Sequence, residues 1–187
     1  MTAAKALKNK GLSILLCEKD SMLGGRLLCD ASKPEIDICG KIQKKSIDTL
    51  KSSSEVSVKL NTCVTGVFDH GYVLAIEEKL QEKNSPKKIL WKIRAKKIVL
   101  CTGAIERPIV FPDNDIPGIM LASSVRDYLE RYGVLVGDKV VLTTNNDDAY
   151  RTALKLKENG IRVPAILDAR EFVESDLVKK AQEEGIR

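Results

Sequence analysis

Glu18 is the first residue whose type and position could bind a ligand. It directly follows the apolar run Ser13–Cys17, which predicts a short strand that ends at this point. In dinucleotide-binding α/β folds, an acidic residue at the end of the second strand accepts hydrogen bonds from ribose hydroxyls. The position therefore favours a ribose contact at Glu18, and a solvated strand end is the simpler alternative for a lone glutamate.

A glycine pair and a cation follow the same strand after a short interval. Backbone N–H groups at Gly24 and Gly25 could approach a pyrophosphate closely, and Arg26 could neutralise its charge. The tripeptide alone is a weak motif, because a simple turn has the same composition. Its position after the Glu18 strand makes the phosphate interpretation more specific.

A third candidate contact lies at Thr102 and Gly103. The run Lys97–Cys101 predicts a buried strand that stops at this pair, with Glu106, Arg107 and Pro108 just beyond. Ligands of α/β sheets bind outside the carboxyl ends of the strands, and a glycine there lets the backbone approach them. We expect this bend to converge with Glu18 on one cofactor; an ordinary strand-to-loop turn is the alternative.

Composition excludes several classes of function. The 187 residues are 43% hydrophobic and 30% charged, with a net charge of +5 and only 4% aromatic residues. The lysines are scattered, and no strand face that combines them with two or three aromatic residues is visible, so we expect no nucleic-acid partner. No apolar run approaches the ~20 residues that span a bilayer, and no leader is visible, so we expect no membrane partner and a cytoplasmic location. Of the five cysteines, which include no C-x-x-C pair, Cys17 and Cys101 are expected in the core and the other three as free thiols. One histidine and no Cys/His cluster predict no metal site.

The remaining elements must position these residues. High helix propensity over residues 2–10 precedes the Glu18 strand, as in the second half of a βαβ unit whose opening strand and glycine loop are absent. Helical spacing covers residues 36–50, and alternating segments predict strands over 56–60, 63–68, 72–77 and 89–94. We interpret these segments as an antiparallel meander, at about 56–94, inserted before the Thr102 strand.

A second unit of the same type follows. A helix is expected from Ser123 to Tyr132, with Ser123 or Ser124 as its N-cap, and then a strand, a helix and a strand ending at Asp168. Asn145, Asn146 and two aspartates stand where a glycine-rich loop would bind pyrophosphate, and carboxylates there would repel it. We expect them to satisfy the N–H groups of the helix instead. The unit is thus interpreted as a scaffold without ordinary dinucleotide binding, and a site built on the Asn side chains is the alternative.

Several motifs together resemble those of a known family, the alpha subunits of heterotetrameric sarcosine oxidases. These belong to the two-dinucleotide-binding-domain flavoproteins of the pyridine nucleotide-disulfide oxidoreductase-like superfamily. The resemblance covers nearly the whole chain and is tightest from Leu90 to Arg170. The matching stretches are Phe68–Val73, Leu90–Lys96, Thr102–Pro108, Asn114–Ala122, Tyr128–Gly133, Thr144–Tyr150 and Asp168–Arg170.

This resemblance implies a fold and a division of the chain. The fold is α/β, a Rossmann-like FAD/NAD(P)-binding fold with an inserted antiparallel β-meander and an incomplete first βαβ unit. The domains expected are a first dinucleotide-binding domain over residues 1–111 and part of a second Rossmann-like domain over 112–187. Because both ends fall inside α/β units, we expect an internal portion of a longer polypeptide.

The resemblance also implies an activity, oxidative demethylation of sarcosine to glycine within an oxidoreductase complex. The expected partners are a flavin-bearing beta subunit, smaller subunits, and tetrahydrofolate bound through a domain outside these residues. NAD, or FAD, would occupy the first nucleotide site, weakly or not at all in this chain alone because the phosphate-binding glycine loop is missing. The residues implied to contact it are Glu18, Lys19, Gly24, Gly25, Arg26, Thr102 and Gly103.

No residue of this chain offers an obvious nucleophile, base or metal ligand, so no catalytic residue is predicted. Glu106 and Arg107 are better explained as a structural ion pair than as acid–base groups. Two alternatives stay open: the alpha subunit of a related amino-acid or opine dehydrogenase, and a non-catalytic scaffold for subunit assembly.

Overall fold

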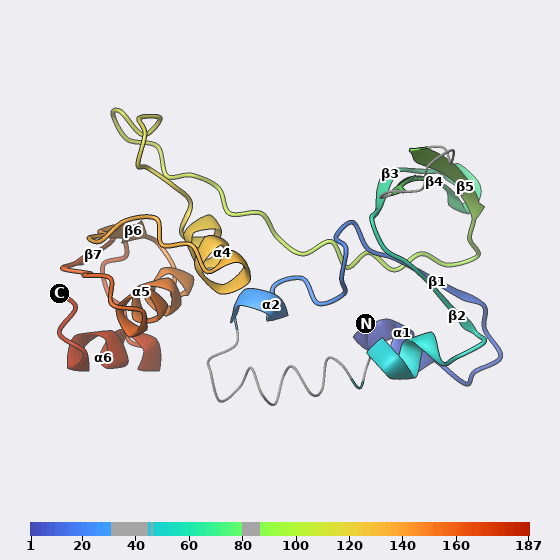
Figure 1. Ribbon diagram of the computed structural model, residues 1–187, viewed down its shortest axis with the longest axis horizontal. Coiled ribbons are helices and arrows are strands. Elements are labelled where there is room, and N and C mark those ends of the chain that lie inside the picture. The colour runs from blue at the N-terminus through green and yellow to red at the C-terminus, as the bar shows by residue number, and fades with distance from the viewer. Residues whose placement is uncertain (31–44, 46, 80–86) are drawn as a thin grey trace. The chain divides into compact units, whose positions relative to one another are not determined.

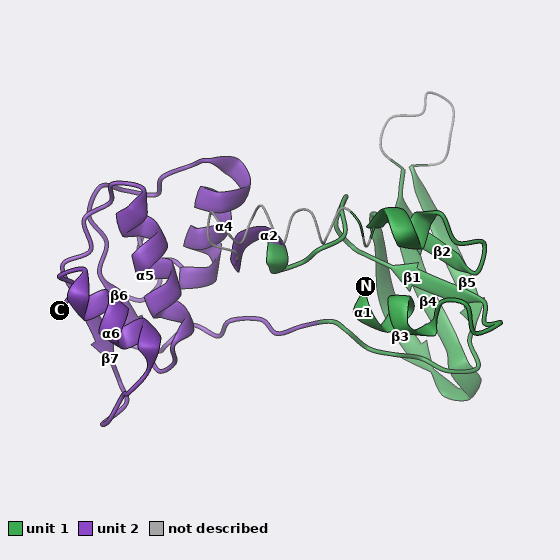
Figure 2. Cartoon of the chain, turned by 90° about the horizontal axis from the view of Figure 1, so that it is seen from below, with its two compact units in different colours: residues 1–27, 33–102 green, residues 28–32, 103–187 purple. Residues whose placement is uncertain are grey.

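A computed structural model describes residues 1–30, 45, 47–79 and 87–187 (Figure 1). The chain divides into two compact units. Unit 1 contains residues 1–27 and 33–102, and unit 2 contains residues 28–32 and 103–187 (Figure 2). The secondary structure is mixed, with two parallel strand pairs and one antiparallel sheet, as expected for an α/β fold.

Unit 1 begins with helix α1 (Thr2–Leu7), followed by strand β1 (Ile14–Cys17). Strand β2 (Val56–Lys59) pairs with β1 in parallel, so that Cys17 lies opposite Lys59. Ala4, Leu50 and Val56 form a small buried cluster on one face of this pair. Leu50 belongs to a helical stretch over residues 47–51; most of the helix expected over 36–50 lies outside the described residues.

The rest of unit 1 is an antiparallel sheet in the order β3-β4-β5. Its strands are β3 (Thr62–Phe68), β4 (Tyr72–Glu78) and β5 (Lys88–Arg94), and the short 3-10 helix η1 (Asp69–Gly71) joins the first two. The inserted meander is therefore present, but it starts at Thr62. The expected first strand of the meander is β2, which belongs to the parallel pair instead, because its apolar residues pack on the α1 side with those of β1.

Three side chains tie the meander to the end of β2. The Trp91 indole donates a hydrogen bond to Glu77 at 2.7 Å, and the Lys59 ammonium lies 4.4 Å from the centre of the Trp91 ring. Lys59 also lies 3.7 Å from the Glu77 carboxylate. The carboxyl end of the parallel pair is thus held by contacts from the neighbouring sheet.

Unit 2 is a β-α-β unit with additional helices. Strands β6 (Leu142–Thr144) and β7 (Ile166–Asp168) pair in parallel, and helix α5 (Asp148–Glu158) connects them. Helices α4 (Ala122–Tyr132) and α6 (Asp176–Glu183) pack against α5. Gly133 ends α4 with a φ of 65°, a left-handed conformation that glycine adopts at low cost.

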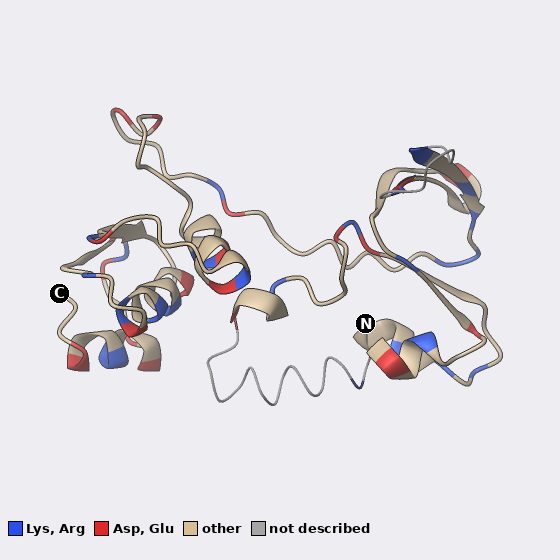
Figure 3. Cartoon of the chain, in the orientation of Figure 1, with Lys and Arg blue, Asp and Glu red and all other residues tan. Residues whose placement is uncertain are grey.

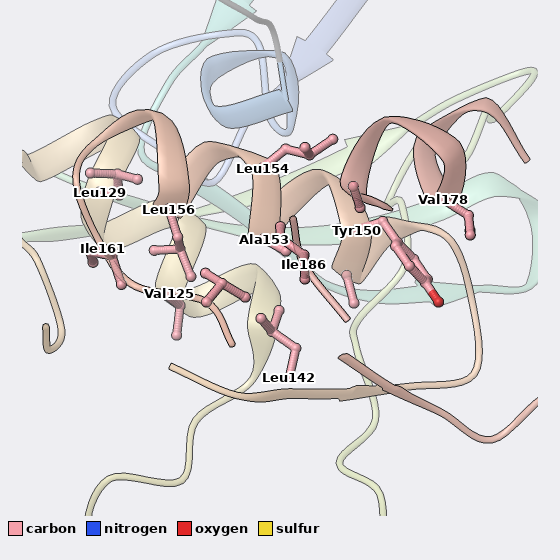
Figure 4. Packing of buried hydrophobic residues seen from close by; sticks show 13 residues of the cluster. Val125, Leu129, Leu142, Tyr150, Ala153, Leu154, Leu156, Ile161, Val178 and Ile186 are labelled. Atoms are coloured by element: carbon pink, nitrogen blue, oxygen red, sulfur yellow. The ribbon is translucent and has the colours of Figure 1, made fainter. Parts of the chain in front are cut away.

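The core of unit 2 is a continuous apolar cluster, shown in Figure 4. It combines Val125 and Leu129 of α4, Leu142 of β6 and the buried face of α5, including Leu156, which is 1% exposed. The apolar residues of α4 recur every three or four positions, so this helix turns one stripe inward. Helix α5 is buried over most of its circumference, because the consecutive residues 152–156 are all buried. The four-residue helix α2 (Leu27–Asp30) spans the division of the chain, because Leu27 belongs to unit 1 and its last three residues belong to unit 2.

Charged residues of both signs are interspersed along the described elements of each unit (Figure 3). No described helix combines the length and the apolar composition needed to cross a lipid bilayer.

Candidate nucleotide-binding edges

Glu18 lies directly after β1, at the carboxyl end of the parallel pair. Its backbone is fixed on both sides: its N–H donates to the Lys59 carbonyl and its own carbonyl accepts from the Thr62 N–H, each at 2.8 Å. One carboxylate oxygen, Oε1, accepts the Asp20 N–H at 3.1 Å. Among the described residues, no hydrogen bond or ion pair uses the other oxygen, Oε2, which leaves it able to accept a ligand hydroxyl.

The glycine pair after β1 forms a tight turn. Gly24 and Gly25 have φ values of 140° and 53°, and the Leu27 N–H donates to the Gly24 carbonyl at 3.2 Å. A Cβ added at Gly25 would meet nothing within 4 Å. This glycine is therefore required by its backbone conformation and not by a close neighbour. Arg26 and Lys19 are exposed.

The structure differs from expectation at Thr102 and Gly103. The run Lys97–Cys101 forms no strand, and its side chains are exposed, with Val99 at 62% and Leu100 at 69%. Cys101, expected in the core, is exposed as well. An apolar run of high β-propensity forms a buried strand only where a neighbouring strand can hydrogen-bond to its backbone. In the described residues, β1 and β2 pair only with each other and offer no third parallel strand.

The convergence of this bend with Glu18 stays a prediction. Thr102 is the last residue of unit 1, the unit that also contains Glu18, whereas Gly103 belongs to unit 2. The expected domains, 1–111 and 112–187, likewise stay a proposal. What the structure does bring together within unit 1 is Glu18 and the ends of β2 and β3.

The corresponding edge of unit 2 is filled by an ion network. Asp168 ends β7 at the position equivalent to Glu18, and its two carboxylate oxygens accept hydrogen bonds from the Arg170 guanidinium at 3.0 and 2.7 Å. The Tyr150 hydroxyl donates to the same carboxylate at 3.0 Å. Arg170 also lies 2.8 Å from Asp147.

These contacts determine the charge states of Asp168 and Tyr150. The hydrogen bonds from Arg170 lower the pKa of Asp168 to about 2, against the opposing effect of burial. Burial and the bond to Asp168 raise the pKa of Tyr150, so its hydroxyl stays a donor. At neutral pH, Asp168 is thus ionised and both of its oxygens accept hydrogen bonds from Arg170. A ribose would have to displace Arg170 to reach the carboxylate.

The turn before α5 is satisfied internally, though not in the expected way. The Asn146 side-chain oxygen accepts the Asp148 N–H at 3.0 Å, and the Thr144 hydroxyl accepts the Asn146 N–H. The Asp147 and Asp148 carboxylates, expected to bond these N–H groups, pair with arginines instead. Arginine competes successfully because a charged, multidentate partner binds a carboxylate more strongly than an amide does.

Two further residues carry contacts that the sequence interpretation missed. Arg126 is 1% exposed and pairs with Asp148. It lies on the apolar stripe of α4, four positions after Ala122 and three before Leu129, and this spacing could have identified its burial but not its partner. Glu106 accepts the Ser123 N–H at 2.8 Å, at the start of α4. It therefore serves the helix N-terminus rather than pairing with Arg107, and neither Ser123 nor Ser124 is the N-cap, which is Leu121.

Comparison with known proteins agrees with the resemblance inferred from the motifs. The chain is 38% identical over 197 aligned residues to the sarcosine oxidase subunit alpha of Corynebacterium sp. strain P-1, covering 100% of this chain and 20% of that subunit. It is 36% identical to the same subunit from Corynebacterium sp. strain U-96, covering 92% and 18%, and 35% identical to that from Rhizobium meliloti strain 1021, covering 97% and 19%. The chain thus spans about one fifth of the length of these relatives. No protein-family model matches the sequence.

Solved structures support the fold. The L-proline dehydrogenase of P. horikoshii superposes with a TM-score of 0.65 at 24% identity, covering 92% of this chain and 34% of that one. The reduced CoADR-RHD protein of Bacillus anthracis superposes with a TM-score of 0.50 at 13% identity, covering 97% and 33%. At these identities the likeness concerns the architecture, which is the expected Rossmann-like α/β arrangement with its antiparallel insertion.

Proposed function

We propose that this chain is the nucleotide-binding portion of the alpha subunit of a sarcosine oxidase-type complex, an oxidoreductase that demethylates sarcosine to glycine. The observation that carries the proposal is the 35–38% identity with three such subunits over 92–100% of the chain. The partners implied are a flavin-bearing beta subunit, smaller subunits and, through a domain outside these residues, tetrahydrofolate.

The nucleotide is proposed to bind unit 1, and the residues present fit part of it. Glu18 has a carboxylate oxygen free among the described residues, and the positive φ at Gly24 and Gly25 turns the chain without side chains in the way. Exposed Arg26 and Lys19 would neutralise the phosphates. Thr102 and Gly103 are proposed to complete the site. NAD or FAD bound there would supply two-electron oxidation and reduction.

The residues that would anchor the pyrophosphate most firmly do not lie in this chain. No G-x-G-x-x-G loop is found in the 187 residues, and the N–H groups of a helix N-terminus after such a loop normally hold the two phosphates. Glu18 would therefore orient the ribose without fixing the phosphates. We expect the 187-residue chain alone to bind NAD or FAD weakly.

A domain replacement tests the proposal. The matching region of the Corynebacterium strain P-1 alpha subunit is replaced by this chain, and the assembled complex is assayed for sarcosine-dependent oxygen consumption and for bound NAD. We expect both to be retained, and Glu18→Gln to lower the bound NAD. Asp138→Asn is the control, because Asp138 is exposed and belongs to unit 2. An assembled complex that binds no nucleotide would contradict the proposal and favour a scaffold role.

A further inference from the structure

The sheet β3-β4-β5 of unit 1 has one covered face and one uncovered face. On β4, Val73, Ala75 and Glu77 are at most 9% exposed and mark the covered face. The residues that alternate with them point to the opposite side, and so do the residues paired with those in the neighbouring strands. We call this side the outer face; it includes Phe68, Tyr72, Glu78, Leu90, Lys92 and Arg94.

Two aromatic residues and an arginine are held together at one end of the outer face. The rings of Phe68 and Tyr72 lie 6.0 Å apart, and the Arg94 guanidinium carbon lies 5.4 Å from the centre of the Tyr72 ring. Phe68 lies against the backbone at Gly66, where an added Cβ would come within 2.6 Å of its ring. Phe68 and Leu90 are nevertheless each 55% exposed. Aromatic residues and arginines that are fixed in place and still exposed are typical of the residues that dominate binding in protein–protein interfaces.

The outer face carries more positive than negative charge. Its Glu78 carboxylate lies 2.9 Å from Lys88 and is thereby neutralised. Lys92 and Arg94 are exposed, and neither forms an ion pair with a carboxylate in the part of the chain that the structure describes. Arg94 instead donates a hydrogen bond to the His70 carbonyl at 3.1 Å. A surface complementary to the outer face would therefore carry carboxylates.

This charge disfavours a second copy of the chain as the partner. A symmetric contact between two copies would place one positively charged patch against another, and like charges in contact oppose association. A partner of a different kind fits the charge better. The relatives of the chain are alpha subunits, which have partner chains.

We propose that the outer face of the β3-β4-β5 sheet is a docking surface for another subunit of the complex, one that presents carboxylates beside apolar side chains. Phe68, Tyr72 and Leu90 would supply most of the buried apolar area, while Lys92 and Arg94 would orient the partner. The choice of a subunit of this complex as the partner rests on the function proposed above. The uncovered, positively charged face does not depend on it.

The reactivity of Lys92 shows whether the outer face is covered, and by what. Acetylation of lysines by acetic anhydride is measured by peptide mass spectrometry in three samples: the 187-residue chain, the chimeric alpha subunit alone and its assembled complex. We expect Lys92 to react equally in the first two samples and about fivefold or more slowly in the complex, because contact with a subunit excludes the reagent. Full reactivity in the complex would overturn the proposal. So would protection in the alpha subunit alone, since the rest of that subunit would then cover the face.

A charge reversal tests whether Lys92 takes part in docking. The chimeric alpha subunit is titrated with the remaining subunits, and Lys92→Glu is compared with Lys5→Glu. Lys5 is exposed on α1 of the same unit, so the second variant makes the same change of charge elsewhere. We expect Lys92→Glu to weaken association by about tenfold or more at an unchanged melting temperature, and Lys5→Glu to change it by less than about twofold. Equal effects of the two variants would contradict a specific contact and indicate an effect of net charge alone.

Other occupants of the outer face give different results. Dimerisation of the 187-residue chain that Lys92→Glu abolishes would identify a second copy as the partner. Binding to single-stranded DNA or to anionic lipid vesicles that Lys92→Glu abolishes, without an effect on subunit association, would identify a polyanion instead. Each of these results would overturn the proposal.

The outcome for docking is separable from that for the proposed function. A complex that assembles through Lys92 and holds no NAD would contradict the nucleotide-binding role and leave the docking surface standing. A chimeric alpha subunit that holds NAD and does not associate with the other subunits would overturn the docking surface alone.

Discussion

The two units present the same edge of a parallel strand pair in two different states. In unit 1, Glu18 follows β1 with one carboxylate oxygen bonded to a backbone N–H and the other unused among the described residues. In unit 2, Asp168 ends β7 with both oxygens bonded to Arg170 and one of them also to Tyr150. The same acidic position is thus open in one unit and internally neutralised in the other.

The difference shows that topology alone does not make a nucleotide site. Both units have a parallel strand pair with an acidic residue at its carboxyl end, but unit 2 has replaced the ligand's contacts with its own side chains. Arg170 takes the place of a ribose, and the Asn146 side chain takes the N–H that a phosphate would use. An edge of this kind stabilises its unit without a cofactor, at the cost of the binding function.

The largest expected effect separates the cores of the two units. Leu156→Ala should lower the free energy of unfolding of unit 2 by about 2–5 kcal/mol, because it opens a cavity in a continuous apolar cluster. Leu50→Ala makes the same change at a residue that is 0% exposed, in the small cluster of unit 1. Native-state hydrogen exchange should report the first change in β6 and α5 and the second in β1 and β2. A loss of protection in both units from either variant would mean that they unfold as one, contrary to the comparison.

An intermediate effect is expected at Asp168, where the edge of unit 2 is occupied by Arg170. Asp168→Asn should destabilise unit 2 by about 1–3 kcal/mol, because charge-assisted hydrogen bonds to Arg170 are lost, with exposed Asp138→Asn as the control. The folded pKa of Asp168, about 2, lies below its ordinary value of 3.8. Its contribution to stability is therefore fully present above about pH 4 and is lost as the pH falls toward 2. Urea denaturation between pH 2 and pH 5 should show a steeper loss for the parent chain than for Asp168→Asn, and equal slopes would contradict this assignment.

The smallest effect on stability is expected at Glu18, at the carboxyl end of β1 in unit 1. Glu18→Gln should change the free energy of unfolding by less than about 0.5 kcal/mol, because the amide oxygen can still accept the Asp20 N–H. The result contrasts with Asp168→Asn at the equivalent position. A loss as large as that of Asp168→Asn would show that Glu18, too, is a structural residue, and the two edges would no longer differ.

Local signals in the sequence predicted most of the elements. The alternation of residues 63–68, 72–77 and 89–94 predicted the meander, and Gly133 marked the end of α4. The missed features depend on partners distant in the sequence. The Lys97–Cys101 run has strand composition but no strand beside it, and Glu106 caps a helix 16 residues later. Arg126 pairs with Asp148 and Arg170 pairs with Asp168 at the edge of unit 2. The sequence shows where these arginines lie, but not which carboxylates the fold brings to them.

The comparison is tested most directly by a titration of the 187-residue chain with NAD, followed by backbone amide chemical shifts. The account predicts weak binding, with a Kd of about 1 mM or more, and shifts confined to Glu18–Arg26, the neighbouring ends of β2 and β3, and Thr102 and Gly103. Shifts centred on Asn145–Asp148 and Asp168, or micromolar affinity despite the missing glycine loop, would contradict it.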